Sequence, residues 1–427
     1  ACPLLLLFSF CLSIKCNHFI LQKNDCFFKL VTYICKNLIL SMIENQFFSS
    51  GFKLGILGGG QLGKMLLYDS IRYDIYTKVM DPNKNAPCHK ICDEFIIGDL
   101  TDYGHVVKFC EDVDVVTVEI ENVNTDALEF LEKNGKKVYP SSKTLKTIQN
   151  KSKQKDFYIK NKLPTSSYKN YLKKSELISD LNKGYFELPS VWKSAKFGYD
   201  GKGVKIVKTL EDIKNLPDLE CLIEQKVKIK KEVSVIVARN SNKDETCFPI
   251  VEMEFNDDSN MVEYVICPAN ISKELEEKAY NIALQTARCF KSIGLLAVEL
   301  FITENDEILI NEVAPRPHNS GHHTIECCYT SQFDQHIRSI LNLPLGNTDL
   351  KIPGIMLNLV GENKIEGYVK YENIDKILDI PGVSAHFYGK KKSRLNRKMG
   401  HITVVNNEIE EALKIGKNIK KIVKVTA

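Results

Sequence analysis

The chain carries two strand-like runs on either side of a short polar turn: Leu296-Ala297-Val298-Glu299-Leu300-Phe301 and Ile308-Leu309-Ile310-Asn311-Glu312-Val313. A two-residue turn at Asn305-Asp306 would join them as a hairpin and place Glu299 directly opposite Glu312. Directly opposed residues share a sheet face, with Cβ atoms about 4.5–5.5 Å apart. Two such carboxylates repel each other and lose hydration among apolar neighbours. A divalent cation removes both penalties, so the pattern predicts that Glu299 and Glu312 bind Mg²⁺, with Mn²⁺ able to substitute.

Two alternatives remain open at this hairpin. One acid could be solvated at a sheet edge, or a longer turn could shift the register. The segment after the second run favours a binding site, because it is dense in polar side chains and rigid prolines: Ala314-Pro315-Arg316-Pro317-His318-Asn319-Ser320-Gly321-His322-His323. A loop that leaves a metal-bearing strand is where substrate is expected.

A glycine-rich segment, Gly58 to Gly63, follows the short strand predicted at 53–57 and precedes a helix-like run. Glycines bring backbone amides to the helix N-terminus, where an anion is favoured. The segment fits G-x-G-x-x-G, and Asp81 lies 18 residues beyond Gly63, where a ribose-binding acid could stand. This pattern predicts an NAD(P)-dependent oxidoreductase if taken alone. The same strand, loop and helix can hold any phosphate.

Strand-like runs recur at Tyr76–Met80, Glu94–Ile97 and Val113–Val118, with helical or polar stretches between them. This alternation predicts a parallel α/β layer. The third run leads into Glu119 and Glu121, at the strand end where ligands bind in such sheets. We expect one of these two acids to face the ligand. The alternative is a solvated acid at the start of the next helix.

A lysine-containing strand, Ser190–Ser194, precedes a second glycine-rich segment at 198–204. Glycines let backbone amides reach phosphate oxygens, and Lys193 and Lys202 supply compact point charges. The segment therefore predicts a flexible cover for a polyphosphate, with a plain hairpin turn as the alternative. The basic run at 150–155 is explained most simply as a solvated helix face.

The 427 residues allow two or three domains, and a net charge of +4 argues against nucleic acid or a membrane as partner. The 14 cysteines lack zinc-like pairs, so we expect reduced thiols and a cytoplasmic protein. The apolar run at 3–14 is too short to span a bilayer. Because the first methionine is Met42, we expect translation to begin there, with 1–41 an extension outside the mature fold. A targeting extension is the alternative.

Taken together, four segments resemble the ATP-grasp ligases and, more narrowly, the 5-(carboxyamino)imidazole ribonucleotide synthetases of purine synthesis: 58–66, 197–203, 311–322 and 397–401. The third is the most specific. A formate-dependent glycinamide ribonucleotide formyltransferase of the same superfamily shares Pro-Arg-Pro-His but departs at the next residues, and it remains the nearest alternative. A non-catalytic relative is a third possibility.

The resemblance implies a Rossmann-like parallel α/β domain at 42–145, a central α+β ATP-grasp domain with a mobile lid at 146–345, and a small C-terminal domain at 346–427. It further implies ATP- and bicarbonate-dependent carboxylation of 5-aminoimidazole ribonucleotide, a homodimer, and a separate mutase that receives the product. Carboxyphosphate, or CO₂ released from it, would be the carboxylating species.

The resemblance also implies roles for single residues. The catalytic group comprises Lys193, Tyr199 and Asp200. The ATP-binding group comprises Lys151, Lys193, Gly198, Tyr199, Asp200, Gly201, Lys202, Gly203, Val204, the adenine hinge Glu224, Gln225, Lys226 and Val227, the ribose-binding Glu232, and Glu252, Asn311 and Glu312. The substrate-binding group comprises Gly60, Gln61, Leu62, Glu119, Glu121, Tyr199, Asp200, Asn319, Ser320, Lys390, Arg397 and Lys398. Two positions depart from the family: Val251-Glu252-Met253-Glu254 replaces a common Glu-Asn before a histidine, and His323 replaces a common tryptophan.

Overall fold

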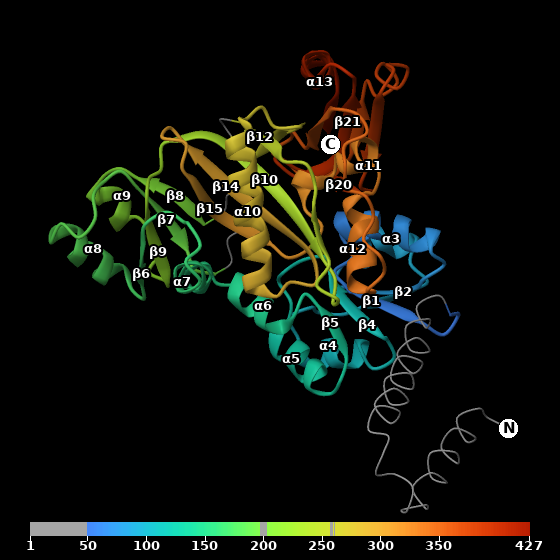
Figure 1. Cartoon of the computed structure of the whole chain (residues 1–427), viewed down its shortest axis with the longest axis horizontal. Helices are drawn as coiled ribbons and strands as arrows, with labels where there is room; N and C mark the ends of the chain where they lie inside the picture. The colour runs from blue at the N-terminus through green and yellow to red at the C-terminus, as the bar shows by residue number, and fades with distance from the viewer. Residues whose placement is uncertain (1–48, 197–202, 257–258, 260) are drawn as a thin grey trace, which may run out of the picture. The chain divides into compact units, whose positions relative to one another are not determined.

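Three sheet-based regions follow one another along the described chain (Figure 1). The computed structural model describes residues 49–196, 203–256, 259 and 261–427. Residues 1–52 form one unit, of which only the turn at 49–52 is described, and Lys53–Ala427 form the other. The predicted extension 1–41 therefore lies outside the described residues. No helix in the described part of the chain is long and apolar enough to cross a membrane.

A five-stranded sheet of order β3-β2-β1-β4-β5 forms the first region, and all its pairs are parallel. Its three central strands, β2, β1 and β4, are almost wholly buried, as expected for a parallel sheet covered by helices. The predicted α/β layer is confirmed. The elements are β1 Lys53–Leu57, α3 Gln61–Arg72, β2 Tyr76–Asp81, η3 Pro87–Lys90, β3 Glu94–Ile97, α4 Tyr103–Phe109, β4 Val115–Val118, α5 Thr125–Lys133, β5 Lys137–Tyr139 and α6 Ser142–Ile148.

A small antiparallel sheet of order β6-β9-β7-β8 follows, packed with two short helices around the buried Trp192. Its elements are α7 Lys151–Lys160, β6 Tyr168–Tyr171, α8 Lys174–Asn182, β7 Ser190–Ser194, β8 Val204–Val207, α9 Leu210–Lys214 and β9 Cys221–Gln225. The Asn150 side chain accepts a hydrogen bond from the Lys153 amide and so begins α7. The basic run predicted as a solvated helix face is thus a helix, and parts of it are buried.

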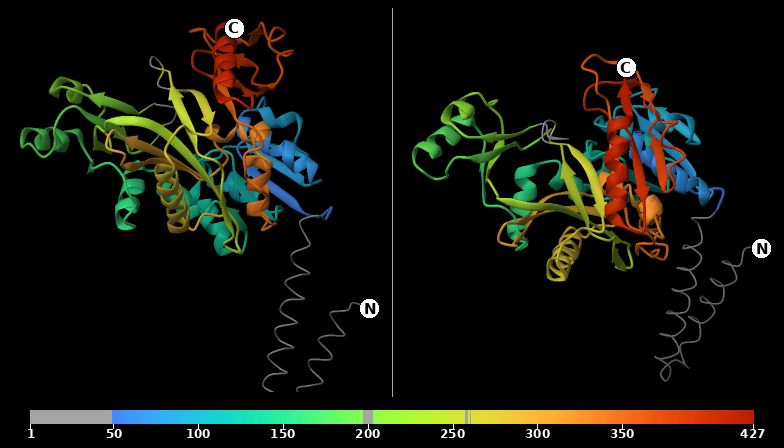
Figure 2. Two further views of the ribbon diagram at one scale, coloured as in Figure 1. Left: turned by 45° about the horizontal axis from the view of Figure 1, so that its top comes forward. Right: turned by 90° about the horizontal axis from the view of Figure 1, so that it is seen from above.

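A nine-stranded sheet of order β15-β14-β10-β12-β13-β16-β21-β19, with β11 beside β10, spans the third region. Its first elements are β10 Ile229–Arg239, β11 Glu245–Cys247, β12 Val251–Phe255, β13 Val262–Cys267, α10 Lys273–Phe290, β14 Gly294–Thr303, β15 Ile308–Ala314, η4 Asn319–Gly321, α11 Thr324–Cys327 and α12 Gln332–Ile340. Figure 2 shows this sheet from two further sides.

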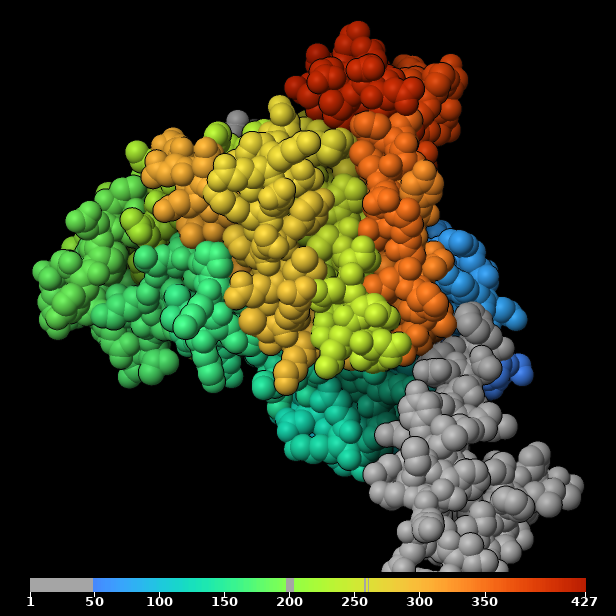
Figure 3. All heavy atoms as spheres, in the orientation of Figure 1, coloured from blue at the N-terminus to red at the C-terminus, as the bar shows by residue number. Residues whose placement is uncertain are grey.

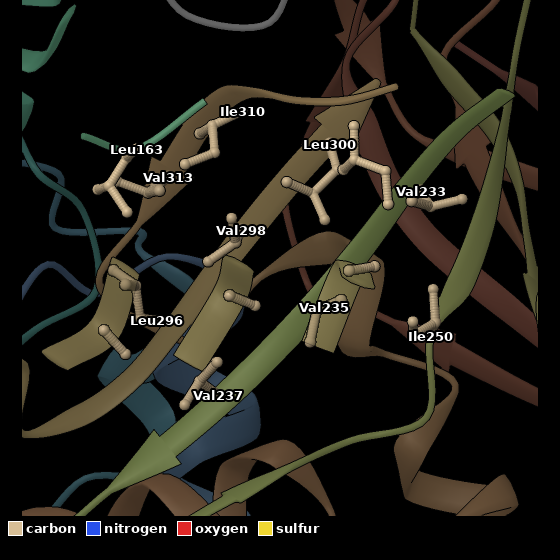
Figure 4. Packing of buried hydrophobic residues seen from close by; sticks show 14 of the residues in the cluster. Leu163, Val233, Val235, Val237, Ile250, Leu296, Val298, Leu300, Ile310 and Val313 are labelled. Carbon is tan, nitrogen blue, oxygen red and sulfur yellow. The ribbon is translucent and has the colours of Figure 1, made fainter. Parts of the chain in front are cut away.

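One face of the large sheet is apolar and packs against α10. Alternate residues of β10 and β14, among them Val233, Val235, Val298 and Leu300, form its core together with Ala283 of α10 (Figure 4). In Figure 3 the side chains of α10 form the molecular surface over this core. Because successive side chains of a strand point to opposite faces, the residues between these valines and leucines face the other way.

The C-terminal region continues the same sheet, since Tyr264 of β13 pairs with Leu357 of β16. Helix α13 packs against β16, where Gly416 leaves room for Ile355. The elements are β16 Gly354–Val360, β17 Gly367–Tyr368, β18 Lys370–Glu372, β19 Val383–Phe387, β20 Lys392–Ser393, β21 Lys398–Val405, α13 Ile409–Ile422 and β22 Lys424–Thr426.

The hairpin between β14 and β15 differs from the predicted two-residue turn. The Thr303 amide donates to the Glu307 carbonyl, and Asp306 adopts φ 58°, so the loop has three residues. This loop alone would move Glu312 out of register with Glu299. A β-bulge at Asn311 inserts one extra residue and restores the pair, so Glu299 faces Glu312.

Candidate active site

The predicted acid pair lies on the polar face of the large sheet. Glu299 pairs with Glu312 on β15 and with Ser234 on β10, and Glu232 lies two residues further along β10 on the same face. Burial raises the pKa of Glu299, and the charges of Glu312 and Glu232 add to the effect. Lys151, whose Nζ is 2.7 Å from Glu312 Oε2, holds the pKa of Glu312 below its usual range.

These residues fit a hard divalent cation. Among the described residues, the ion-pair neighbour of Glu299 is the His318 imidazole, with Nε2 3.5 Å from Oε1, while the charges of Glu312 and Glu232 oppose that of Glu299, so its charge is poorly compensated. Within the described ranges, no group of three or more histidine, cysteine or acidic side chains could hold a metal by itself. Two carboxylates leave the remaining positions to water and phosphate oxygens, which is the usual way that Mg²⁺ binds with a nucleotide.

Two predicted ATP-binding lysines lie beside this pair. Lys193 Nζ is 3.1 Å from Glu224 Oε1 and 3.1 Å from Asn311 Oδ1. The bulge that restores the acid register also brings Asn311 to Lys193. Lys151 begins α7, and its ion pair with Glu312 brings a second cation to the same face. The arrangement suits the triphosphate of a nucleotide, whose negative charge both lysines and a bound cation would neutralise.

Glu232 carries a testable pH signature, because burial raises its pKa from 4.5 to about 7. The folded protein without ligand therefore holds this proton between pH 4.5 and about 7, where the unfolded chain releases it. The contribution of Glu232 to the free energy of unfolding falls as pH rises through that window. We expect Glu232→Gln to gain stability relative to the wild type between pH 5 and pH 8, measured by denaturant unfolding.

The matched control for this measurement is Glu304→Gln on the exposed hairpin turn. It is expected to follow the wild type at every pH. A constant stability difference between Glu232→Gln and the wild type from pH 5 to pH 8 would contradict the assignment.

A cavity of about 580 Å³ lies next to the acid pair, lined by residues from the first region and from the third region, including its C-terminal part. It gathers most of the predicted substrate-binding residues: Gly60, Gln61, Leu62, Glu119, Asn319, Lys390, Arg397 and Lys398. It also contains His318, which lies beside Glu299, so the cavity and the acid pair share one loop. Lys390 Nζ donates to Gln61 Oε1 at 2.6 Å and so joins the C-terminal basic stretch to the glycine-rich loop.

Glu119 occupies the space in front of the glycine-rich loop. Its Oε1 accepts from the Leu62 amide at 3.1 Å, and a Cβ on Gly58, which has φ 106°, would lie 2.9 Å from Oε2. A carboxylate therefore satisfies the start of α3, where a dinucleotide pyrophosphate would have to bind. Asp81 accepts from the Gly59 amide at 2.9 Å and supports the loop. This geometry argues against the NAD(P)-dependent oxidoreductase.

Family models match three consecutive parts of the chain: a ribonucleotide synthetase preATP-grasp domain at 52–149, an ATP-grasp domain at 156–333, and a phosphoribosylaminoimidazole carboxylase C-terminal domain at 354–415. The N5-carboxyaminoimidazole ribonucleotide synthase of Bacillus subtilis is 36% identical over 373 residues, which cover 86% of this chain and 95% of that protein. The chain belongs to the N5-carboxyaminoimidazole ribonucleotide synthase family.

Solved structures agree with this assignment to the family. The synthetase from Thermotoga maritima matches with a TM-score of 0.81 and 41% identity, over 88% of this chain and 99% of that one. The Aspergillus clavatus synthase in complex with ADP and 5-aminoimidazole ribonucleotide matches with a TM-score of 0.79 and 33% identity, over 87% and 98%. The resemblance and the fold class predicted from the sequence are confirmed, and the family is one of ATP-dependent ligases.

The chain covers a smaller share of a longer plant relative than of the bacterial synthase. The phosphoribosylaminoimidazole carboxylase of Vigna aconitifolia, named as chloroplastic, is 36% identical over 368 residues, which cover 83% of this chain but only 64% of that protein. The bacterial synthase is matched over nearly its whole length. The shared part therefore corresponds to the synthase.

Three further residues predicted to bind ATP or substrate have side chains that contact other side chains of the protein. Glu121 is 2.8 Å from Arg316 Nε, whereas Glu119 lines the cavity, so Glu119 is the acid that faces it. Glu252 holds Lys231 through both carboxylate oxygens at 2.6 Å. Ser320 is buried, and its hydroxyl is 2.9 Å from that of Ser234. Each of these side chains has a partner within the protein.

The predicted hinge and cover are described only in part. Glu224 is the penultimate residue of β9, and its carboxylate is directed at lysines, so only the hinge backbone and Gln225, Lys226 and Val227 remain for adenine. Gly203, with φ 78°, directly precedes β8, which begins at Val204. The other predicted cover residues, Gly198, Tyr199, Asp200, Gly201 and Lys202, lie outside the described residues.

Residues that sequence reasoning did not assign also line the cavity. Arg316 lies between Glu121 and the cavity, and Arg394 and Asn396 precede the predicted clamp residue Arg397. Arg316 lies in the polar, proline-containing segment 314–323 that the sequence predicts to contact substrate, so it could have been assigned. His323 is buried, and burial lowers its pKa to about 4. A neutral ring packed in this way is consistent with the tryptophan common in the family at that position.

Proposed function

We propose that the protein carboxylates the exocyclic amine of 5-aminoimidazole ribonucleotide with bicarbonate and ATP, releasing ADP and phosphate. One observation carries the proposal: the Glu299–Glu312 pair and the basic cavity share the loop that contains His318 and Asn319. A phosphoryl-transfer site and a nucleotide-sized cavity therefore lie within reach of one another. The ADP and 5-aminoimidazole ribonucleotide bound to the Aspergillus clavatus relative are the same two kinds of ligand.

In the first step a bicarbonate oxygen attacks the γ-phosphorus of ATP, and the bond to the β-phosphate oxygen breaks to give carboxyphosphate and ADP. Lys151 and Lys193 position the phosphates and offset their charge, while Glu232 accepts from the ribose hydroxyls. Glu299 and Glu312 would hold Mg²⁺ or Mn²⁺, whose charge stabilises the transferring phosphoryl group when bound. The protein contributes mainly position and electrostatics.

In the second step the exocyclic amine attacks the carboxyl carbon of carboxyphosphate, or of CO₂ released from it. The C–O bond to phosphate breaks, and the amine loses one proton as the C–N bond forms. Lys390, Arg397 and Lys398 would hold the ribonucleotide phosphate, and Glu119 its ribose side. Asn319 would position the carboxyl group. Asp200 and Tyr199 keep their predicted roles beside the amine.

The phosphate clamp gives a prediction about substrate affinity. Lys390→Met is expected to raise KM for the aminoimidazole ribonucleotide by about 10- to 100-fold, because a charge-assisted hydrogen bond contributes about 1.5–3 kcal/mol. KM for ATP should stay near the wild-type value, because Lys390 lines the cavity proposed for the ribonucleotide and is not among the residues proposed to bind ATP. Steady-state kinetics with each substrate varied separately measure both constants.

Lys391→Met is the matched control for the clamp, since this neighbouring lysine contacts Asn85 and does not line the cavity. Equal effects of Lys390→Met and Lys391→Met on KM for the ribonucleotide would count against the clamp.

A coupled assay of ADP release tests the proposed reaction, with each component omitted in turn. ADP formation is expected to require both the aminoimidazole ribonucleotide and bicarbonate. Equal ATP use with formate and glycinamide ribonucleotide would select the formyltransferase instead. ATP use without any acceptor would reject both ligase assignments.

Four further expectations belong to the proposal. The family resemblance supports a homodimer, which sedimentation of the purified chain would test, and a separate mutase as consumer of the product. Support of turnover by Mn²⁺ in place of Mg²⁺ is tested in the same ADP assay. A cytoplasmic location stays a prediction. It is supported by the nine cysteines in the described part of the chain, all of which are free thiols.

A further inference from the structure

Lys155 of α7 is a buried cation without a role in the reaction described above. Its side chain is 3% exposed, and Nζ contacts Thr165 Oγ1 at 2.6 Å, Ser166 Oγ at 2.9 Å and Glu224 Oε1 at 3.3 Å. An ammonium group has three N–H donors, so these three contacts account for all of them. Burial lowers the pKa of Lys155 to about 8, which leaves it protonated at neutral pH.

The same Glu224 oxygen serves a second lysine. Lys193 Nζ is 3.1 Å from Glu224 Oε1, while Ser166 donates to Oε2 at 2.9 Å. Burial alone would raise the pKa of Glu224, but the two lysines hold it below its usual range. One buried carboxylate therefore lies between two ammonium groups, and this small cluster carries a net positive charge.

The two lysines are not equivalent. Lys155 is enclosed, and its partners Thr165 and Ser166 are themselves fixed, since Thr165 donates to the Ile310 carbonyl at 2.8 Å and Ser166 donates to Glu224. Lys193 lies at the polar face of the large sheet and also contacts Asn311, the neighbour of Glu312. Only Lys193 is placed to turn toward a phosphate.

We propose that Lys155 is a positioning residue: it supplies the permanent counter-charge of Glu224, so that Lys193 can leave Glu224 for the nucleotide phosphates. This inference rests on the proposed ATP binding. Separating the only cation from a buried carboxylate would leave an uncompensated charge, which is strongly unfavourable. With Lys155 in place, Glu224 remains neutralised when Lys193 moves.

The experiment measures binding of a non-hydrolysable ATP analogue, adenylyl imidodiphosphate with MgCl₂, by titration calorimetry on the full chain. Lys155→Met leaves Lys193 as the sole cation beside Glu224 and is expected to weaken binding by at least about tenfold. The double variant Lys155→Met with Glu224→Gln removes one positive and one negative charge. It frees Lys193 and is expected to regain most of the lost affinity.

Two comparisons isolate the mechanism from a general loss of structure. In a Glu224→Gln background, adding Lys155→Met is expected to change affinity by less than about threefold, because no buried carboxylate remains to capture Lys193. Lys153→Met, on the same helix but exposed, is the control and should bind as the wild type does. A purely structural role of Lys155 would not be relieved by Glu224→Gln.

Each outcome bears on the inference. Wild-type affinity in Lys155→Met overturns it, as does a double variant that binds no better than Lys155→Met. If Lys155→Met does not fold, a double variant that folds but binds more than about tenfold more weakly than the wild type overturns it as well. Absence of binding to the wild-type chain rejects ATP binding itself, and so the proposed function, before Lys155 is tested.

Discussion

Replacing Glu299 or Glu312 with glutamine is expected to lower the rate of ADP formation by more than about a hundredfold while the fold survives. Loss of even an indirect partner of a metal ligand costs about 10- to 100-fold in affinity or activity, so loss of a direct carboxylate ligand should cost more. Glu299→Gln also removes a largely buried, poorly compensated carboxylate, so the variant should be at least as stable as the wild type at pH 8. Turnover is measured at saturating ATP with MgCl₂ titrated.

Glu307→Gln on the exposed hairpin turn is the control for this pair and should turn over normally. Chelation of divalent cations with EDTA should abolish activity in the wild type, and added Mg²⁺ should restore it. Near-normal turnover in both glutamine variants would remove the metal assignment, even if the family assignment stands.

Replacing Lys193 with methionine is the second large effect that we expect. This lysine is the cation placed between Glu224 and Asn311, beside the acid pair. Removal of one preorganised group that stabilises developing charge costs about 10²–10³ in kcat. Single-turnover measurement of ADP formation should therefore show a loss of about that size, with a smaller change in the affinity for the aminoimidazole ribonucleotide.

Lys205→Met provides the comparison, because Lys205 pairs with Trp192 across the same small sheet but is exposed. Its activity should match the wild type. A loss in Lys193→Met no larger than in Lys205→Met would show that Lys193 does not act on the phosphates.

The acid pair was predictable from the sequence, although the predicted turn was wrong. Alternation placed Glu299 and Glu312 on one polar face, and that face is set by burial of Val298 and Leu300 on the other. The three-residue loop and the bulge at Asn311 shift the register in opposite directions and cancel. Neither the loop length nor the bulge can be predicted from the alternation of polar and apolar residues. A bulge depends on tertiary contacts such as that of Asn311 with Lys193.

Contacts between distant segments were beyond the sequence pattern. A basic run such as the one at Lys390 reads as a solvated surface until its contact with Gln61 is known. Lys155 also belonged to a run interpreted as solvated, yet it is buried against Glu224. In both cases the local composition is that of a surface, and only tertiary packing brings an acceptor to the ammonium group.

The packing of buried aromatic rings in the loop at 314–323 could not be predicted from the sequence either. His322 of that loop stacks on His401 of β21, with ring centroids 4.8 Å apart, and both rings are buried. Burial lowers the pKa of both, so the rings are neutral and pack as aromatic groups. Polar residues in a loop usually indicate contact with solvent or a ligand. The local sequence does not distinguish such residues from buried rings that stack, as His322 and His401 do.

Transfer of ¹⁸O from labelled bicarbonate to phosphate tests the central claim most directly. If a bicarbonate oxygen attacks the γ-phosphorus, the phosphate released with 5-aminoimidazole ribonucleotide present should carry one ¹⁸O from the bicarbonate per turnover, detected by mass spectrometry. Phosphate without this label, formed at the same rate as ADP, would mean that water or another acceptor attacks ATP, and would contradict the account.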